Sequence, residues 1–294
     1  RGLGDVYKRQ WEYNALIVTM IKSIRNVGLI SLIIGLALLL FAFYPKESFL
    51  GEFIHNVYAS LSCEFTSVAI TILLINYLYD KKAEESNKKR LLRELGSEDK
   101  GFTSRALKEI KELGYLTDGT LNGLDLTNAN LAGLDFTGAD LKNVIFKNAS
   151  LTNTVFTGAS LDNANFDGAT LLQSNFENCI LRKVSCKNCN FYSSIFNHCN
   201  IQDSDMLKSN FEQVEFVDVI MTDVKLEDTC LKLGNFTRTV FKQCNFSKAD
   251  ITSANLKGAT FERCELRYIE GWEEIIDRES STFSACINMP VSHS

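Results

Sequence analysis

The chain has 294 residues, a formal net charge of −5 and 45% hydrophobic residues. This acidic balance argues against direct nucleic-acid binding, which needs a basic surface. The sequence has only three histidines, no Gly-rich phosphate loop and no Ser-His-Asp or Cys-His arrangement, so it predicts a protein that is not an enzyme, with no catalytic, cofactor-binding or metal-binding residues.

The first ten residues stand apart from the rest of the chain. Residues 5–10, Asp-Val-Tyr-Lys-Arg-Gln, resemble the translation of a transposon-end adapter used in sequencing libraries. We therefore expect residues 1–10 to be an adapter artefact and the natural start of the protein to be missing.

Two apolar stretches follow within residues 11–79. Residues 27–44 form an uncharged run, close to the roughly 20 residues that cross a bilayer as a helix. Residues 57–79 are apolar apart from Glu64 and several Ser and Thr. The pattern predicts two transmembrane helices, at about 27–44 and 57–79. A signal peptide is the alternative for the first run, although no clear small-residue cleavage site follows it.

Basic residues flank the two predicted spans on their outer sides. Lys22 and Arg25 precede the first span, six Lys or Arg lie between residues 81 and 93, and the connecting loop carries Lys46 alone. By the positive-inside rule, both termini and everything after the second span face the cytoplasm. Cysteines there are expected to be free thiols, because that compartment is reducing.

Glu64 is the one acidic residue inside a predicted span. An ionisable side chain in hydrocarbon is costly and marks a candidate functional residue. Ser60, Ser67 and Thr71 on the same span are small enough to let helices approach closely. We expect Glu64 to bond a neighbouring helix and fix a homo-oligomer; a transport or proton-relay role, or a position in the headgroup region, are the alternatives.

Residues 80–115 are predicted to form a helical connector. Residues 80–95 continue as a charged helix, Gly96 breaks it, and residues 101–113 form a shorter amphipathic helix. Its predicted apolar face carries Phe102, Ala106, Ile110 and Leu113. We expect this second helix to cover the start of the domain that follows.

A five-residue period fills the chain from Leu121 to Leu266. Every fifth residue, here named the centre, is large and apolar, and Leu or Phe occupies twenty-five of the thirty centres. A small or β-branched residue usually lies two positions before the centre, Asp or Asn usually precedes it, and Gly or Asn recurs two positions after it. Helices repeat at about 3.6 residues and strands at 2, so a period of 5 predicts a solenoid of short strands and tight corners.

The repeat resembles the pentapeptide-repeat family, for example in Ala-Asn-Leu-Ala-Gly at residues 129–133 and Ala-Asp-Leu-Lys-Asn at 139–143. The resemblance implies an all-β solenoid over residues 116–270, a right-handed quadrilateral β-helix with twenty residues per coil. The spans and connector are similar to those of bacterial two-span membrane proteins that carry such repeats, which implies the bacterial cytoplasmic (inner) membrane. Residues 271–294, beginning Gly-Trp-Glu-Glu-Ile, resemble a C-terminal cap and tail.

Residues twenty apart are expected to stack in such a coil. One predicted lumen column is wholly aromatic: Phe136, Phe156, Phe176, Phe196, Phe216 and Phe236. Cys186, Cys189 and the His198-Cys199 pair superficially suggest zinc, but the repeat phase points the three cysteines into the lumen and His198 outward. We therefore expect cysteine to be a small apolar filler here.

Three functions are compatible with this organisation. The first is a membrane-anchored scaffold that presents a rigid β-helix to an unknown protein partner. The second is suggested by family members that resemble B-form DNA and protect DNA gyrase, but residues 116–270 carry nineteen acidic and fourteen basic residues, a net of only −5. The third is an accessory subunit of a transporter or channel. An acidic run is a candidate patch, although a solvated surface explains it as well: Glu212, Glu215, Asp218, Asp223, Glu227 and Asp228.

Overall fold

The computed structural model describes residues 25–39 and 51–290, without the side chains of residues 51–56 and 58. The predicted adapter segment, residues 1–10, and residues 40–44 of the first predicted span lie outside the described residues. The chain divides into two compact units, residues 1–88 and 89–294.

The first unit contains a helix pair. An apolar helix spans Arg25–Leu39, and α2 spans Gly51–Leu95, so the second predicted span and the charged segment after it form one continuous helix. Among the described residues, Ala59–Leu95 is the one helix long and apolar enough to cross a bilayer. Two membrane-spanning helices are therefore not established: the Arg25–Leu39 helix, as described, is apolar but shorter.

The two helices approach closely at glycines. A Cβ added to Gly28 would meet Ile72 at 2.9 Å, and one added to Gly35 would meet Thr66 at 2.7 Å, so the helices run antiparallel. The buried Ser62 hydroxyl donates a hydrogen bond to the Gly35 carbonyl at 2.8 Å. Small side chains at the seam thus replace the large ones that fill a water-soluble core.

The second unit begins with the end of α2 and with α3, Lys100–Glu112. Asp99 caps α3 by accepting hydrogen bonds from the backbone N–H groups of Gly101 and Phe102. The buried face of α3 consists of Thr103, Ala106, Leu107 and Ile110.

The predicted apolar face of this helix was partly wrong. Phe102 and Leu113 are 44% and 48% exposed, whereas Ala106 and Ile110 are buried as expected. A helix turns 3.6 residues per turn, so positions chosen at steps of four drift around it. Each buried residue from Thr103 to Ile110 lies three or four positions along the helix from another, so they all lie on one face.

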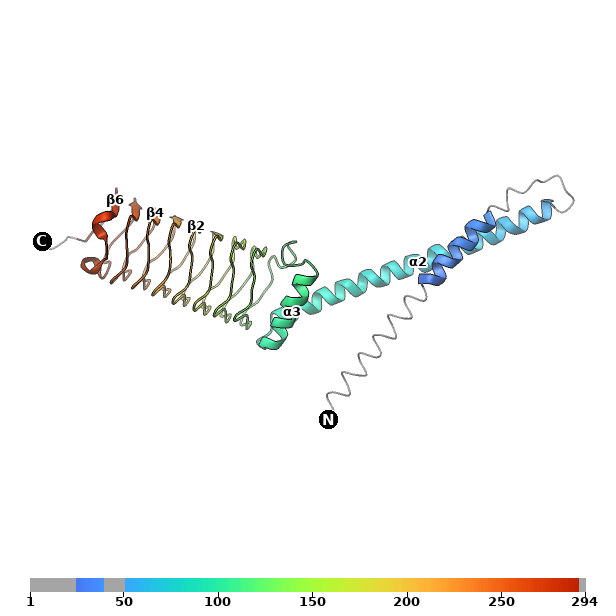
Figure 1. The fold of residues 1–294 in the computed structure, drawn as a ribbon, viewed down its shortest axis with the longest axis horizontal. Helices are drawn as coiled ribbons and strands as arrows, with labels where there is room; N and C mark the ends of the chain where they lie inside the picture. Colours follow the sequence, from blue (N-terminus) through green and yellow to red (C-terminus); the bar gives the residue numbers. More distant parts are fainter. Residues whose placement is uncertain (1–24, 40–50, 291–294) are drawn as a thin grey trace, which may run out of the picture. The chain divides into compact units, whose positions relative to one another are not determined.

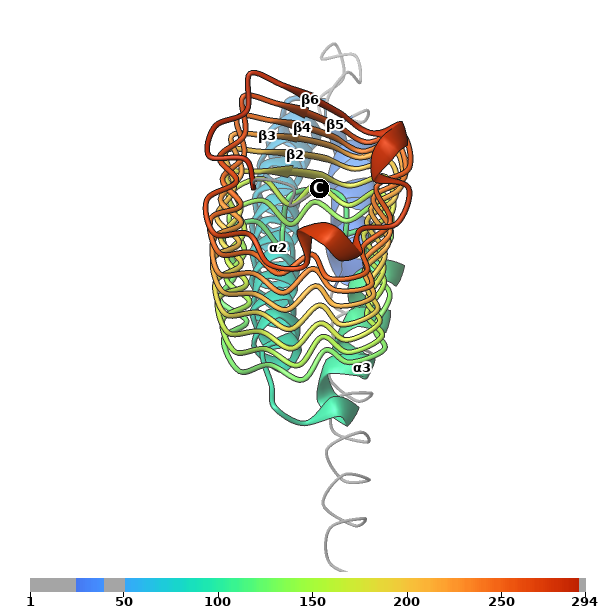
Figure 2. The same ribbon diagram turned by 90° about the vertical axis from the view of Figure 1, so that its left-hand side faces the viewer.

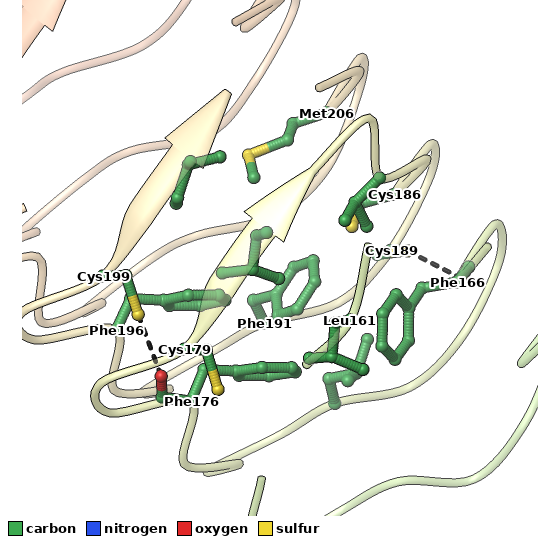
Figure 3. Packing of buried hydrophobic residues seen from close by; sticks show 14 of the residues in the cluster. Leu161, Phe166, Phe176, Cys179, Cys186, Cys189, Phe191, Phe196, Cys199 and Met206 are labelled. Atoms are coloured by element: carbon green, nitrogen blue, oxygen red, sulfur yellow. Dashed lines mark hydrogen bonds between the residues drawn. The ribbon is translucent and has the colours of Figure 1, made fainter. Parts of the chain in front are cut away.

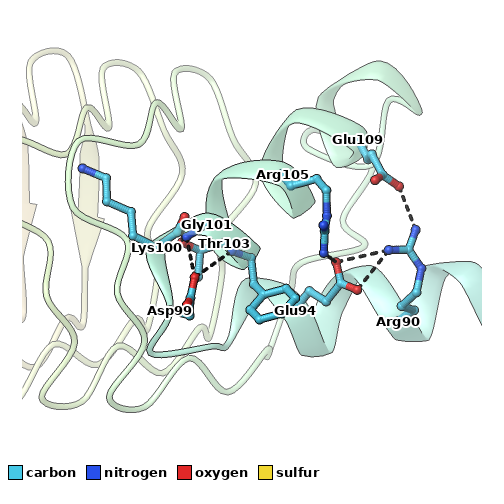
Figure 4. Close-up of polar contacts among 9 residues, drawn as sticks. Arg90, Glu94, Asp99, Lys100, Gly101, Thr103, Arg105 and Glu109 are labelled. Atoms are coloured by element: carbon cyan, nitrogen blue, oxygen red, sulfur yellow. Dashed lines mark hydrogen bonds and ion pairs between the residues drawn. The ribbon is translucent and has the colours of Figure 1, made fainter. Parts of the chain in front are cut away.

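The N-terminal end of the β-helix is closed by this connector. Ser97 and Thr103 satisfy Asn130 of the first coil: its N–H donates to the Ser97 carbonyl at 2.9 Å, and its carbonyl accepts from the Thr103 hydroxyl at 2.7 Å. Arg90 binds Glu94 and Glu109, which ties the end of α2 to α3 (Figure 4). The connector thus occupies backbone groups that an open end would leave unpaired.

The β-helix is built from parallel pairing of coils twenty residues apart (Figure 1). One side of the β-helix forms a six-stranded parallel sheet in the order β1-β2-β3-β4-β5-β6. Their bounds are Ile180–Arg182, Asn200–Gln202, Ile220–Thr222, Val240–Lys242, Thr260–Glu262 and Thr282–Ser284.

Isolated parallel bridges continue the twenty-residue register from Asp125↔Ile145 to Asp250↔Glu270, and the last two, Asn255↔Ile276 and Glu265↔Ile287, join residues twenty-one and twenty-two apart. Each twenty-residue coil therefore has four paired positions, which gives four sides, and the coils overlie one another when viewed from the C-terminal end (Figure 2).

Every corner has a left-handed backbone. All thirty residues two positions after a centre have φ between +52° and +72°, including Leu233 and Tyr268. In most five-residue units, the N–H of the residue three positions after the centre donates to the carbonyl of the centre, as Leu124 does to Leu121 at 3.1 Å. This hydrogen bond closes a type II turn. Gly and Asn suit this geometry, and the fold imposes it on larger residues as well.

Asp and Asn before the centre act as backbone partners, as the repeat predicts. Asp125, for example, accepts the N–H of Thr127 at 3.0 Å, and Asn175 accepts that of Glu177 at 2.8 Å. These side chains stabilise the corners and are not free for chemistry.

The β-helix continues beyond the predicted boundary at residue 270. β6 pairs with β5 through Phe261↔Phe283, twenty-two residues apart instead of twenty. The added length lies in a segment with two short 3₁₀ helices, Trp272–Glu274 and Arg278–Ser280. Trp272 is buried and its ring lies 5.2 Å from that of Phe283, so the last coil retains an aromatic core.

Candidate interaction surface

The lumen is filled with side chains and holds no substrate-sized cavity among the described residues. The six phenylalanines of the predicted column are buried, and successive rings stack at 4.6 to 5.6 Å between centroids. A space of about 10 Å³ remains near Phe236 and Phe241, about the minimum for one water molecule. The lumen therefore has a structural role.

The lumen cysteines are engaged by the backbone. Cys189 and Cys199 donate to the carbonyls of Phe166 and Phe176, each at 2.9 Å (Figure 3). Burial raises the pKa of the Cys179 thiol to about 12, which disfavours the thiolate that binds metals. His198 lies on an outward corner with φ of 61°. The described residues contain no group of three or more His, Cys, Asp or Glu placed to hold a metal ion.

Charges on the outer surface pair one coil apart. Arg182 binds Asp162 at 2.7 Å, and Arg238 binds Asp218 at 2.5 Å through two guanidinium nitrogens. The Arg238 guanidinium also lowers the pKa of Asp218. These pairs break up any continuous negative stripe of the kind that a DNA-like surface requires.

The predicted acidic run is partly engaged in the same way. Besides Asp218, Glu215 accepts a hydrogen bond from Asn235 at 2.8 Å, and Glu227 accepts one from Asn245 at 2.6 Å. Three of the six acidic residues therefore accept a hydrogen bond from a side chain in the next coil. This pattern fits a hydrated outer surface better than a binding patch.

The outer side of β1–β6, here named the β1–β6 face, carries apolar side chains that the sequence analysis did not single out. Ile180 and Ile220 are 47% and 46% exposed, and Val240 follows in the same column. The sequence signal is a β-branched residue directly before the centre, where other units have Asp or Asn.

Glu64 lies on an exposed face of α2. Among the described residues it has no hydrogen bond or ion pair. The Arg25–Leu39 helix packs on another face, where Ser62 and Ala69 are buried. The Arg25–Leu39 helix is therefore not the neighbouring helix that Glu64 is expected to bond.

Comparison with known families decides the identity of the repeat. Residues 121–158, 159–197, 194–232 and 235–267 match the family described as pentapeptide repeats, in eight copies. The chain belongs to the pentapeptide-repeat family. A search of curated proteins found no match to this pentapeptide-repeat protein.

Solved pentapeptide-repeat structures are similar to it in part. A protein from the Arabidopsis thaliana thylakoid lumen is 22% identical, with 34% of this chain and 70% of that chain covered and a TM-score of 0.33. HetL, involved in heterocyst differentiation regulation in the cyanobacterium Nostoc sp., is 15% identical, with 60% and 93% covered and a TM-score of 0.27. Full-length QnrB1, a plasmid-mediated fluoroquinolone resistance protein, is 16% identical, with 58% and 87% covered and a TM-score of 0.28.

Proposed function

We propose that this pentapeptide-repeat protein is a non-enzymatic scaffold, anchored in the bacterial cytoplasmic membrane and presenting its β-helix to a protein partner in the cytoplasm. The observation that carries the proposal is the surface of α2. Large apolar side chains are exposed around it, among them Ile70 at 61% and Leu74 at 54%. Such a surface is unstable in water and suits hydrocarbon.

The β-helix supports the scaffold part of the proposal by elimination. Its lumen is filled, and its corner Asp and Asn residues bind backbone, so only the outer faces are left for recognition. Ile180 and Ile220 favour the β1–β6 face. Ion pairs there, such as Arg182 with Asp162, already neutralise charge, so the fitting partner is a protein with an apolar surface of low net charge.

Membrane insertion and orientation are tested together in bacterial cells. The full chain should stay in the membrane pellet after alkaline carbonate extraction. Cysteines added at Lys46 and Lys257 in a Cys63→Ser background then report topology through a membrane-impermeant maleimide, and the Cys63→Ser parent gives the labelling of the native β-helix thiols. We expect Lys46→Cys to react in intact cells and Lys257→Cys only after lysis. Extraction by carbonate would contradict the anchor, and labelling of Lys257→Cys in intact cells would contradict the cytoplasmic β-helix.

A further inference from the structure

We propose that a second copy of this chain binds the exposed polar stripe of α2 inside the membrane. The stripe consists of Ser60, Glu64, Ser67 and Thr71. The inference rests on the proposed membrane anchor, because only hydrocarbon around the helix makes these groups costly to leave unpaired.

The stripe lies opposite the seam of the helix pair. Ser62 and Ala69 are buried seven residues apart on the side that faces the Arg25–Leu39 helix. At about 100° per residue, Glu64 lies about 200° around α2 from Ser62, and Thr71 lies about 200° from Ala69. The intrachain pair therefore cannot cover the stripe.

The stripe contains a carboxyl group that makes no hydrogen bond among the described residues. Within residues 25–39 and 51–290, neither Glu64 nor the Ser67 hydroxyl has a hydrogen-bond partner. Thr71 is different, because its hydroxyl donates to the Ser67 carbonyl of its own helix at 2.9 Å. A carboxyl facing lipid lacks both water and protein partners, so an acidic residue at a helix centre is costly to leave unpaired.

A second copy supplies what Glu64 lacks. All copies enter the bilayer with the same orientation, so two α2 helices related by a twofold axis along the membrane normal run parallel. Glu64 of one copy then lies within a helical turn of Ser60 and Ser67 of the other, and the same contact occurs twice. The stripe carries both acceptors and donors, and its small side chains permit close approach, so it is self-complementary.

Disulfide cross-linking tests this arrangement in native membranes. In a Cys63→Ser background, Ser67→Cys places a thiol on the stripe, and Leu61→Cys places a matched control on another exposed part of α2. With copper phenanthroline, we expect a covalent dimer for Ser67→Cys at least tenfold more abundant than for Leu61→Cys. Equal yields from both positions would overturn the proposal; the Cys63→Ser parent gives the background from the β-helix thiols.

The role of the carboxyl is measured by the dimer dissociation constant in detergent micelles. Glu64→Leu should weaken dimerisation about three- to tenfold, whereas Glu64→Gln, which can still hydrogen-bond, should stay within about twofold of the natural protein. An unchanged constant for Glu64→Leu would also overturn the proposal. Carbonate extraction of each variant distinguishes failure of the proposed dimer from failure of the proposed membrane anchor. A monomer that stays in the membrane contradicts only dimerisation through the stripe. A protein released from the membrane contradicts the anchor as well.

Discussion

The β-helix and the helix pair place polar and apolar side chains in opposite ways. In the β-helix, Phe176 and the other centres are buried and charged residues face outward. In the helix pair, Gly28, Gly35 and Ser62 form the seam while large apolar residues such as Ile70 face outward. The contrast supports the proposed membrane anchor, because apolar burial stabilises a fold only where it excludes water.

The two regions also differ in how they satisfy buried polar groups. In the β-helix, buried hydroxyls bond the backbone of the previous coil, as Ser194 donates to the Leu171 carbonyl at 2.6 Å. In the helix pair, Asn76 is 7% exposed, yet its Nδ2 has no partner among the described residues. The β-helix leaves one carboxylate oxygen each of Asp140 and Glu227 without a hydrogen bond, but both carboxylates accept one through their other oxygen.

The largest expected effect comes from reversing the polarity of the lumen. Phe176→Asp removes a stacked ring and buries an unpaired charge, which should destabilise the β-helix by more than about 5 kcal/mol. Thermal unfolding of the full chain, followed by circular dichroism, measures the loss. Phe176→Leu is the matched control and should cost about 1 kcal/mol; a natural melting curve for Phe176→Asp would refute the lumen assignment.

Next in size is the seam of the helix pair. Gly35→Leu would drive a side chain into Thr66 and should separate the helices at a cost of about 1 to 3 kcal/mol. The readout is an interhelix disulfide between Leu32→Cys and Ala69→Cys, which lie midway between the two glycine contacts. Its formation should slow strongly in the Gly35→Leu variant. Ala37→Leu, on an exposed position of the same helix, should leave the rate unchanged; equal rates in both variants would exclude the glycine seam.

A smaller effect, of opposite sign, is expected at a corner of the β-helix. Leu233 has φ of +55° and is 52% exposed, so it bears the left-handed strain without filling the lumen. Leu233→Asn should stabilise the β-helix by about 1 kcal/mol and raise the unfolding midpoint by about 2 to 4 °C. Leu172→Asn, at a position without positive φ, serves as control and should give no increase.

The smallest effect is a pH dependence of the N-terminal cap. Lys111 binds Asp135 at 2.7 Å, and this hydrogen bond lowers the pKa of Asp135 to about 2. The unfolded value is about 3.9. The pair therefore adds stability above about pH 4 that is lost as the pH falls towards 2. Solvent screening limits it to about 1 kcal/mol or less, because Asp135 is half exposed.

Hydrogen exchange of α3 amides between pH 2 and 5 can detect this contribution. Lys111→Met should remove the pH-dependent part of the protection. Lys108→Met, an exposed lysine on the same helix, should keep it. Identical pH profiles for the two variants would show that the Lys111 contact contributes nothing.

The five-residue period was sufficient to predict the coil because each unit depends only on its neighbours. It placed the aromatic residues in the lumen and assigned Asn128 and Asn143 to corners, and the structure has them there. The twenty-two-residue spacing at β6 was not predictable, because residues 271–281 leave the period and their path depends on packing around Trp272.

The outer surface was harder to predict than the core. On the β1–β6 face, Ile180, Ile220 and Val240 stand before the centre. Ile145, Val155 and Ile195 do so on other sides, so the sequence signal does not single out this face. On α3, exposure of Phe102 and Leu113 depended on where the Asp99 cap begins the helix and on what Asn130 presents to it. Both features are set by tertiary contacts rather than by local sequence.

In-cell photo-cross-linking is the measurement that tests the scaffold most directly. A photoreactive amino acid at Ile220 probes the β1–β6 face, and the same group at Glu212 probes the opposite side of the β-helix. We expect a reproducible cross-link from Ile220 to one protein other than the chain itself, identified by mass spectrometry, and none from Glu212. Cross-links to copies of the chain alone, or equal capture from both positions, would contradict a scaffold that binds its partner through this face.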